Sequence, residues 1–263
     1  MKRVATALVL IPVVLAVIVW APAWLFAGLT AVVALLAGRE VMGLAEATGL
    51  RPYRWVAMAA IGATVLVLGL DPTWMERYGL ALLVGIVVAV LLAALAHARP
   101  GPVGNLGGAG ATLLAVAYPG LMLGLFALIR RGRFGGAWLI FMLVVIWLGD
   151  TAALYAGRAW GRHKMAPSIS PGKSWEGAAA SLGAAVVVGA GVGAWQGDLK
   201  LIVLAVALNI AGQAGDLVES ALKRSAGAKD SGGLLPGHGG VLDRVDAMLL
   251  AAPVLWWFLV IGH

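Results

Sequence analysis

The residues best suited to chemistry gather in one polar stretch near the end of the chain, between residues 216 and 246. Apolar segments long enough to cross a bilayer lie on both sides of this stretch. Ionisable groups between two such segments are costly to place, and by default they mark a functional site. The stretch interleaves carboxylates and basic side chains: Asp216, Glu219, Asp230, Asp243 and Asp246 with Lys223, Arg224, Lys229, His238 and Arg244.

A polar stripe leads into this stretch with the period of a helix. It begins inside an apolar segment and ends among the charged residues, as the wall of a polar cavity in a helix bundle would. At about 100° per residue its members share one helix face, with Glu219 at the edge. The members are spaced i, i+4, i+7, i+11 and i+14: Asn209, Gln213, Asp216, Ser220 and Lys223.

A glycine-rich loop at residues 231–240 contains five glycines. Its backbone can approach a ligand closely, and its N–H groups can cradle phosphate oxygens. Directly after it, Asp243 and Asp246 are three residues apart at the start of the last apolar segment, so both carboxylates share a helix face. A carboxylate pair of this kind can hold a hard cation such as Mg²⁺ through oxygen ligands.

A second polar loop, at residues 167–177, precedes another apolar segment. We expect its Ser168, Ser170, Lys173 and Ser174 to face nucleotide phosphates near a helix N-terminus, which favours anions. An ordinary N-cap by Ser170 before Pro171 also explains part of this loop, and the two interpretations are compatible. Gly172-Lys173-Ser174 is not a P-loop, because the Walker pattern needs a glycine at position 167 and the chain has proline there.

Together these motifs resemble the signature of the phosphatidate cytidylyltransferase family, also called the CDP-diacylglycerol synthases. The resemblance rests on Ser220-x2-Lys223-Arg224-x4-Lys229-Asp230-x5-Pro236-x-His238-Gly239-Gly240-x2-Asp243-Arg244-x-Asp246. Two upstream segments resemble the same family: Ser170-Pro171-x-Lys173-Ser174-Trp175-Glu176-Gly177 and Gly149-Asp150-Thr151-Ala152-Ala153-x-Tyr155. The first hundred residues match only in having repeated apolar segments.

The resemblance implies transfer of a cytidylyl group from CTP to phosphatidate, which gives CDP-diacylglycerol and pyrophosphate. For that reaction we expect Asp216, Asp243, Lys223 and Asp246 to be catalytic. We expect Mg²⁺ on Asp216 and Asp243, with Glu219, Asp246 and Asp150 as further candidate ligands and room for a second cation. A salt bridge to Arg158 explains Asp150 about equally well.

The remaining candidates would contact the phosphates of CTP or phosphatidate. They are Ser170, Lys173, Ser174, Ser220, Arg224, Lys229, His238, Gly239, Gly240 and Arg244. A phosphate nucleophile is already ionised and needs no base, so we expect His238 to shape the loop rather than to move a proton. Arg suits bidentate phosphate recognition, and Lys supplies a point charge.

Composition predicts an all-α, polytopic integral membrane protein. The mean hydropathy is +0.96, 62% of residues are hydrophobic and only 12% are charged. With no cysteine, the chain has no disulfide, thiolate metal site or Cys nucleophile. We attribute the net charge of +7 to basic loops that meet anionic lipid headgroups, and not to a nucleic-acid partner.

Apolar runs predict about nine transmembrane helices, at residues 4–20, 23–44, 55–70, 79–97, 109–129, 137–157, 177–195, 200–222 and 241–261. The start of the chain also resembles a signal peptide, but the length of its apolar run and the span that follows favour a retained first helix. A cytoplasmic N-terminus leaves only Arg77, Arg130, Arg131, Arg133 and Lys200 of the 19 basic residues outside. The motif loops then face the cytoplasm, at the inner membrane, with Arg130–Arg133 as the discordant cluster.

Charge distribution predicts a transmembrane scaffold at residues 1–136 and a catalytic region at 137–263. Gly189 and Gly193 form a GxxxG pattern that indicates tight helix packing rather than a ligand loop. By resemblance we also expect a homodimer.

Three other interpretations are weaker. A transporter or binding protein for an anionic, phosphate-containing solute predicts inverted repeats, and none is evident. A CDP-alcohol phosphotransferase needs a glycine after the second Asp of its D-x-x-D motif, and Ala247 stands there. A purely structural protein leaves the polar stripe unexplained.

Overall fold

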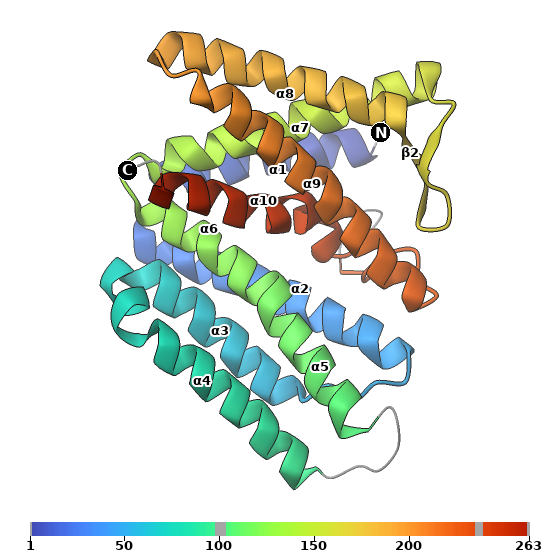
Figure 1. Ribbon diagram of the computed structural model, residues 1–263. Helices are drawn as coiled ribbons and strands as arrows, with labels where there is room; N and C mark the ends of the chain where they lie inside the picture. The colour runs from blue at the N-terminus through green and yellow to red at the C-terminus, as the bar shows by residue number, and fades with distance from the viewer. Residues whose placement is uncertain (1, 98–103, 235–238, 262–263) are drawn as a thin grey trace. The chain divides into compact units, whose positions relative to one another are not determined.

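The computed structural model describes residues 2–97, 104–234 and 239–261, whose course Figure 1 shows. Two compact units divide the chain: the first holds Met1–Gly136 and Ser225–Arg244, and the second holds Ala137–Arg224 and Val245–His263. The glycine-rich loop therefore groups with the first 136 residues, and motif residues fall in both units. The assignment of residues 1–136 to a scaffold and 137–263 to a catalytic region stays a prediction.

The first unit is a layer of apolar helices. Figure 1 shows α3 beside α2 and α4, and α3 also contacts α6. Small side chains bring these helices close, since a Cβ on Gly69 would lie 2.8 Å from the Cβ of Ala127 and 2.9 Å from that of Ala27. The elements are α1 (Lys2–Trp20), α2 (Ala23–Ala47), α3 (Arg54–Leu70), α4 (Pro72–Ala96), α5 (Asn105–Ala115), η1 (Val116–Leu121) and α6 (Met122–Arg131).

The fifth predicted segment is interrupted by η1, a stretch of π-helix that contains Pro119. Proline has no N–H to donate, and its ring clashes with the carbonyl one turn earlier. A π-type widening of the helix accommodates both effects, and the chain continues directly into α6.

The second unit packs its helices around polar as well as small residues. It is built from α7 (Gly135–Trp160), β1 (Lys164–Ala166), β2 (Ser170–Ser174), α8 (Trp175–Gln196), α9 (Lys200–Ser225) and most of α10 (Leu242–Ile261). The GxxxG prediction is confirmed, because a Cβ on Gly189 would lie 2.7 Å from Cα of Ile202 on α9. Gly197, at φ +73°, ends α8 in the left-handed conformation typical of a helix C-terminus.

The helical membrane class predicted from the sequence is confirmed. Each predicted apolar segment coincides with a helical element, and seven helices of the described chain are long and apolar enough to cross a membrane. Two more apolar helices, Ile11–Trp20 and Arg54–Leu70, are shorter. The unforeseen element is the antiparallel hairpin of β1 and β2, which pairs Lys164 with Ser174 and Ala166 with Ser170.

One residue of the discordant basic cluster, Arg130 in the last turn of α6, has a structural role. The Arg130 guanidinium donates to the backbone oxygens of Ile18, Val19 and Ala21, at the end of α1. These carbonyls are among those that a helix leaves without an intrahelical donor, and a cation there also complements the helix dipole. Arg130 therefore serves helix capping, whichever side of the membrane the loop faces.

Arg130→Ala should destabilise the protein, by about 1.5–3 kcal/mol if the lost charged hydrogen bonds dominate. Thermal unfolding in detergent micelles would measure this loss, with Arg131→Ala as the control because Arg131 is an exposed neighbour in the same cluster. Equal stability of the two variants would refute the capping role.

Candidate active site

The first two residues of the polar stripe predicted on α9 take part in a chain of side-chain hydrogen bonds in the second unit. Gln213 Nε2 donates to Asn209 Oδ1 over 2.7 Å, and Asn209 Nδ2 donates to Ser181 Oγ on α8 over 2.9 Å. Asn209 and Ser181 are buried. Gly149 on α7 leaves room for them, because a Cβ there would lie 2.3 Å from Asn209 Nδ2. The stripe therefore faces the interior of its helix bundle.

Asp216, one turn after Gln213, is paired with a cation. Lys173 Nζ on β2 lies 2.9 Å from Asp216 Oδ2 and 3.3 Å from the backbone oxygen of Gln213. The side chains of Lys173 and Asp216 are only 27% and 24% exposed. An ion pair at this depth is screened less than a surface pair, so the charge of each group depends on its partner.

Two more carboxylates lie within electrostatic reach of Asp216. Asp150 comes from α7 and Asp246 from α10, and Lys173 and Lys223 are the cations that offset this group of like charges. Asp150 is exposed, and both its role in a polar cavity and its role as a ligand stay predictions. Within residues 2–97, 104–234 and 239–261, no three His, Asp or Glu side chains gather closely enough to hold a metal ion by themselves.

These carboxylates would nonetheless suit a hard cation that takes its remaining ligands from water and substrate. Mg²⁺ in proteins is commonly held by one or two carboxylates, with waters and substrate phosphates as its other ligands. In the second unit, Asp216 already binds the positive charge of the Lys173 ammonium. Asp216 therefore offers a carboxylate that already pairs with a cation, and metal binding there stays a prediction.

The last turns of α9 hold further predicted residues. Glu219 is 1% exposed and forms an i, i+4 ion pair with Lys223, while Ser220 is half-buried. Arg224 Nε donates to the backbone oxygen of Ile169 in the β1–β2 turn, which ties the hairpin to the end of α9. Glu219 and Lys223 are thus paired with each other, and their catalytic roles stay predictions.

The predicted loop at residues 167–177 is largely the second strand of the hairpin. Ser170 begins β2, and the N-cap of α8 is Ser174, whose Oγ accepts from the N–H of Gly177 over 3.2 Å. The expectation that Ser170 caps this helix is wrong, because the chain is still extended at that point and turns helical only at Trp175. The strand carries Lys173 to Asp216, so the hairpin positions a predicted phosphate-binding residue.

In the first unit, Asp243 organises the glycine-rich loop. Its Oδ2 accepts from Ser231 N at 3.0 Å, Ser231 Oγ at 3.0 Å and Gly240 N at 2.7 Å. Gly239 adopts φ +77°, a conformation that few residues other than glycine tolerate. Asp243 and Asp216 belong to different units, so their predicted pairing through a cation stays a prediction.

Other predicted residues lie around this loop. Lys229 and Arg244 are exposed, Gly240 is buried and Gly239 is half-buried. His238 lies outside the described residues, and its role stays a prediction. Two residues outside the predicted set also lie at this loop: Ser231, its first residue, and Glu40 on α2, which accepts a hydrogen bond from Ser231 Oγ.

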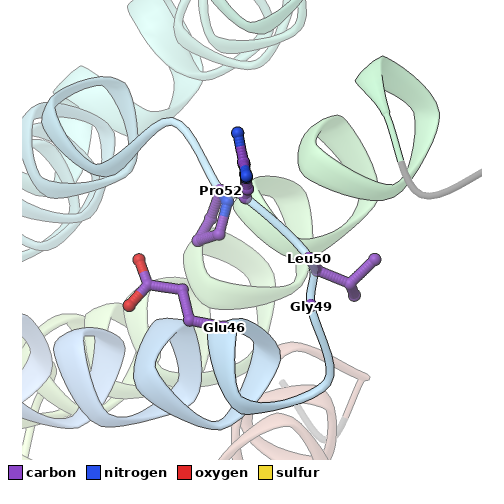
Figure 2. A pocket seen from close by; sticks show the side chains of 5 residues that line it. Glu46, Gly49, Leu50 and Pro52 are labelled. Atoms are coloured by element: carbon purple, nitrogen blue, oxygen red, sulfur yellow. The ribbon is translucent and has the colours of Figure 1, made fainter. Parts of the chain in front are cut away.

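A pocket of about 500 Å³ lies at the connection between α2 and α3, away from the motif residues. Figure 2 shows Glu46 on the last turn of α2 with Gly49, Leu50 and Pro52 on the connecting segment. Glu46 is already engaged by the Arg54 guanidinium. We therefore do not assign this pocket to the site.

Comparison with known proteins identifies related sequences. The model of the "Cytidylyltransferase family" matches residues 1–261. A phosphatidate cytidylyltransferase of Pseudomonas aeruginosa is 35% identical over 96% of this chain and 94% of its own length. That of Brucella suis is 50% identical over 48% of this chain and 47% of its own, and that of Bacillus subtilis is 40% identical over 56% and 57%. In the last two matches the chain spans only about half the length of the relative.

The described helices define a polytopic helical membrane protein whose second unit contains a buried polar chain and a Lys173–Asp216 ion pair. Within that class, the chain belongs to the cytidylyltransferase family.

Proposed function

We propose that this protein transfers the cytidylyl group of CTP to phosphatidate, releasing pyrophosphate and forming CDP-diacylglycerol. The observation that carries the proposal is the Lys173–Asp216 pair at the end of a buried polar chain, in a bundle of apolar helices that also holds Asp150, Asp246 and the Glu219–Lys223 pair. Family membership and the names of the relatives support the same reaction. Both substrates are polyanions, and one carries two acyl chains, so a polar site among membrane helices suits the pair.

The chemistry follows from the charges of the substrates. A phosphate oxygen of phosphatidate attacks the α-phosphorus of CTP, and the bond from that phosphorus to the β-phosphate oxygen breaks. The nucleophile is already an anion, so no side chain has to remove a proton. The protein has to orient the two phosphates and offset the charge that moves onto the leaving pyrophosphate.

Different residues would orient the phosphates, attract the nucleotide and neutralise charge. Lys173 is near enough to Asp216 to be held in place, and its ammonium can donate to a phosphate oxygen as well. Lys229 and Arg244 are exposed and basic, and can draw the nucleotide to the loop. Mg²⁺ bound by Asp216 and Asp243 would supply Lewis-acid neutralisation of the triphosphate. Asp246, Asp150 and Glu219 remain candidate ligands or orienting groups, with room for a second cation.

We further propose nine membrane spans, a cytoplasmic N-terminus and an active site that faces the cytoplasm of the inner membrane. The lipids of that membrane would then be direct partners. Basic residues support this orientation, with Arg130 already accounted for as a helix cap. A homodimer is proposed by analogy with the family.

Single cysteines can test the orientation, because the chain has none of its own. Lys164, Ser225 and Lys200 are exposed positions in the β1–β2 hairpin, the end of α9 and the start of α9. An impermeant maleimide added to intact cells should label Lys200→Cys and leave Lys164→Cys and Ser225→Cys unlabelled. The reverse pattern would overturn the orientation.

The reaction itself is tested with purified protein in sealed vesicles that contain phosphatidate. With labelled CTP outside the vesicles, we expect a labelled lipid-linked cytidine product whose formation depends on phosphatidate. Uptake of label into the vesicle lumen without a new lipid would favour the transporter alternative instead.

A further inference from the structure

The Glu40 carboxylate on α2 accepts hydrogen bonds from both ends of the glycine-rich loop. At the start of the loop, Ser231 Oγ donates to Glu40 Oε2 over 2.8 Å. At its end, Val241 N donates to Oε1 over 2.9 Å, and Leu242 N donates to Oε2 over 2.8 Å. Leu242 begins α10, so Glu40 also satisfies N–H groups that a helix start leaves without an intrahelical acceptor.

Two glycines of the loop make room for this carboxylate. A Cβ on Gly240 would lie 2.3 Å from Glu40 Oε2, and a Cβ on Gly232 would lie 2.7 Å from Glu40 Oε1. Contacts this short cannot be accommodated without moving the carboxylate or the loop. The glycines at these two positions therefore admit Glu40, in addition to any approach of a ligand.

Glu40 is linked to Asp243 through the loop residues. Ser231 Oγ lies 2.8 Å from Glu40 Oε2 and 3.0 Å from Asp243 Oδ2, and its single proton can be donated to only one of them at a time. Gly240, whose N–H donates to Asp243, packs against Glu40 through its α-carbon. A shift of Glu40 would therefore move the groups that hold Asp243.

We propose that Glu40 is a positioning residue of the active site, which acts through Ser231 and Gly240 on Asp243. The inference rests on the proposed function, in which Asp243 holds the cation that acts on CTP. In this proposal Glu40 acts through the loop and is not itself a ligand of the cation. Loss of such an outer partner of a metal ligand typically costs 10–100-fold in activity or metal affinity.

Glu40→Gln is the main test, because an amide keeps the size of the side chain but turns one acceptor into a donor that faces the loop N–H groups. We expect its kcat to fall about tenfold or more, with little change in the KM for phosphatidate. Glu40→Asp keeps both acceptors on a shorter stem and should retain more activity than Glu40→Gln. Gly240→Ala should reproduce the Glu40→Gln defect, and the double variant should be little worse than either.

Two control variants match these changes on the same helix. Glu46→Gln removes a carboxylate that pairs with Arg54, and Gly28→Ala adds a methyl group where nothing lies within 4 Å. Both should keep turnover within about twofold of the unmodified protein, the range expected for substitutions away from special features.

Hydrogen exchange separates positioning from general destabilisation and from the proposed reaction. In Glu40→Gln, the amides of Val241 and Leu242 should exchange faster, while those of α9 stay protected. The inference is overturned if exchange is unchanged, if kcat is unchanged despite faster exchange, or if activity falls only in proportion to unfolded protein. If the unmodified protein made no lipid-linked cytidine, the proposed function would fail, whereas the exchange result would still report on the Glu40 contacts.

Discussion

Asp216→Asn and Asp243→Asn should each lower kcat by roughly a hundredfold or more, the scale of losing a preorganised electrostatic stabiliser. In each variant an amide replaces a carboxylate of nearly the same shape, so the charge is lost with little change in packing. Steady-state turnover of CTP and phosphatidate measures the effect. Asp198→Asn is the matched control, because Asp198 lies in the α8–α9 turn and accepts from Lys200 N.

Asp243→Asn distinguishes two roles of Asp243: accepting hydrogen bonds from the loop and holding a cation. The carbonyl of Asn can still accept from Ser231 and Gly240, which now donate to Asp243 Oδ2. If Asp243 only accepted these hydrogen bonds, Asp243→Asn would lose far less activity than Asp216→Asn. If it holds a cation, the variant is severely impaired even though the loop keeps its hydrogen bonds.

The double variant tests whether the two carboxylates share one cation. A shared site is already broken by either substitution, so the two losses should not add. Excess Mg²⁺ should partly restore each single variant and leave the double variant inactive. Additive losses would contradict a shared cation. A silent Asp243→Asn with an inactive Asp216→Asn would move the cation to Asp216 with Asp150 and Asp246, or to Glu219.

Lys173→Ala should lower kcat/KM for CTP by a factor on the order of a hundred. The substitution removes the ammonium that lies 2.9 Å from Asp216 Oδ2 and that would contact a phosphate of CTP. It also leaves the half-buried Asp216 carboxylate without its nearest cation, which disfavours a further anion at the site. Lys173→Arg should not restore the rate, because a planar guanidinium does not replace a compact ammonium at a fitted position.

Lys164→Ala is the control for Lys173, since Lys164 is exposed on the neighbouring strand of the same hairpin. It should retain nearly normal kinetics for both substrates. A Lys173→Ala variant within about threefold of the unmodified protein would remove Lys173 from the site and reduce its pair with Asp216 to a structural contact.

The sequence was sufficient for features that repeat along the chain. Apolar runs predict helices because a helix satisfies its own backbone within a membrane. The period that aligns Asn209, Gln213 and Asp216 predicts one polar face, and the structure links the first two of these side chains directly. Gly189 and Gly193 predict close packing for a reason that is equally local, the absence of a side chain.

Contacts between distant residues could not be predicted in this way. Glu40 is 191 residues from Ser231, and Lys173 is 43 from Asp216, so no helical or strand period relates them. The hairpin was missed because Lys164–Ala166 and Ser170–Ser174 are too short to establish an alternating pattern. Pro119, by contrast, carries a local signal for a disturbed helix, because proline interrupts the helical hydrogen-bond pattern.

The fate of each CTP phosphate tests the proposed cytidylyl transfer most directly. Purified protein is supplied with phosphatidate vesicles, Mg²⁺ and CTP labelled at either the α- or the γ-phosphorus. Cytidylyl transfer would put the α label into the lipid fraction and release the γ label as pyrophosphate in equal amount, and Asp216→Asn should lose both. Entry of the γ label into lipid, or cleavage of CTP without a labelled lipid, would contradict it.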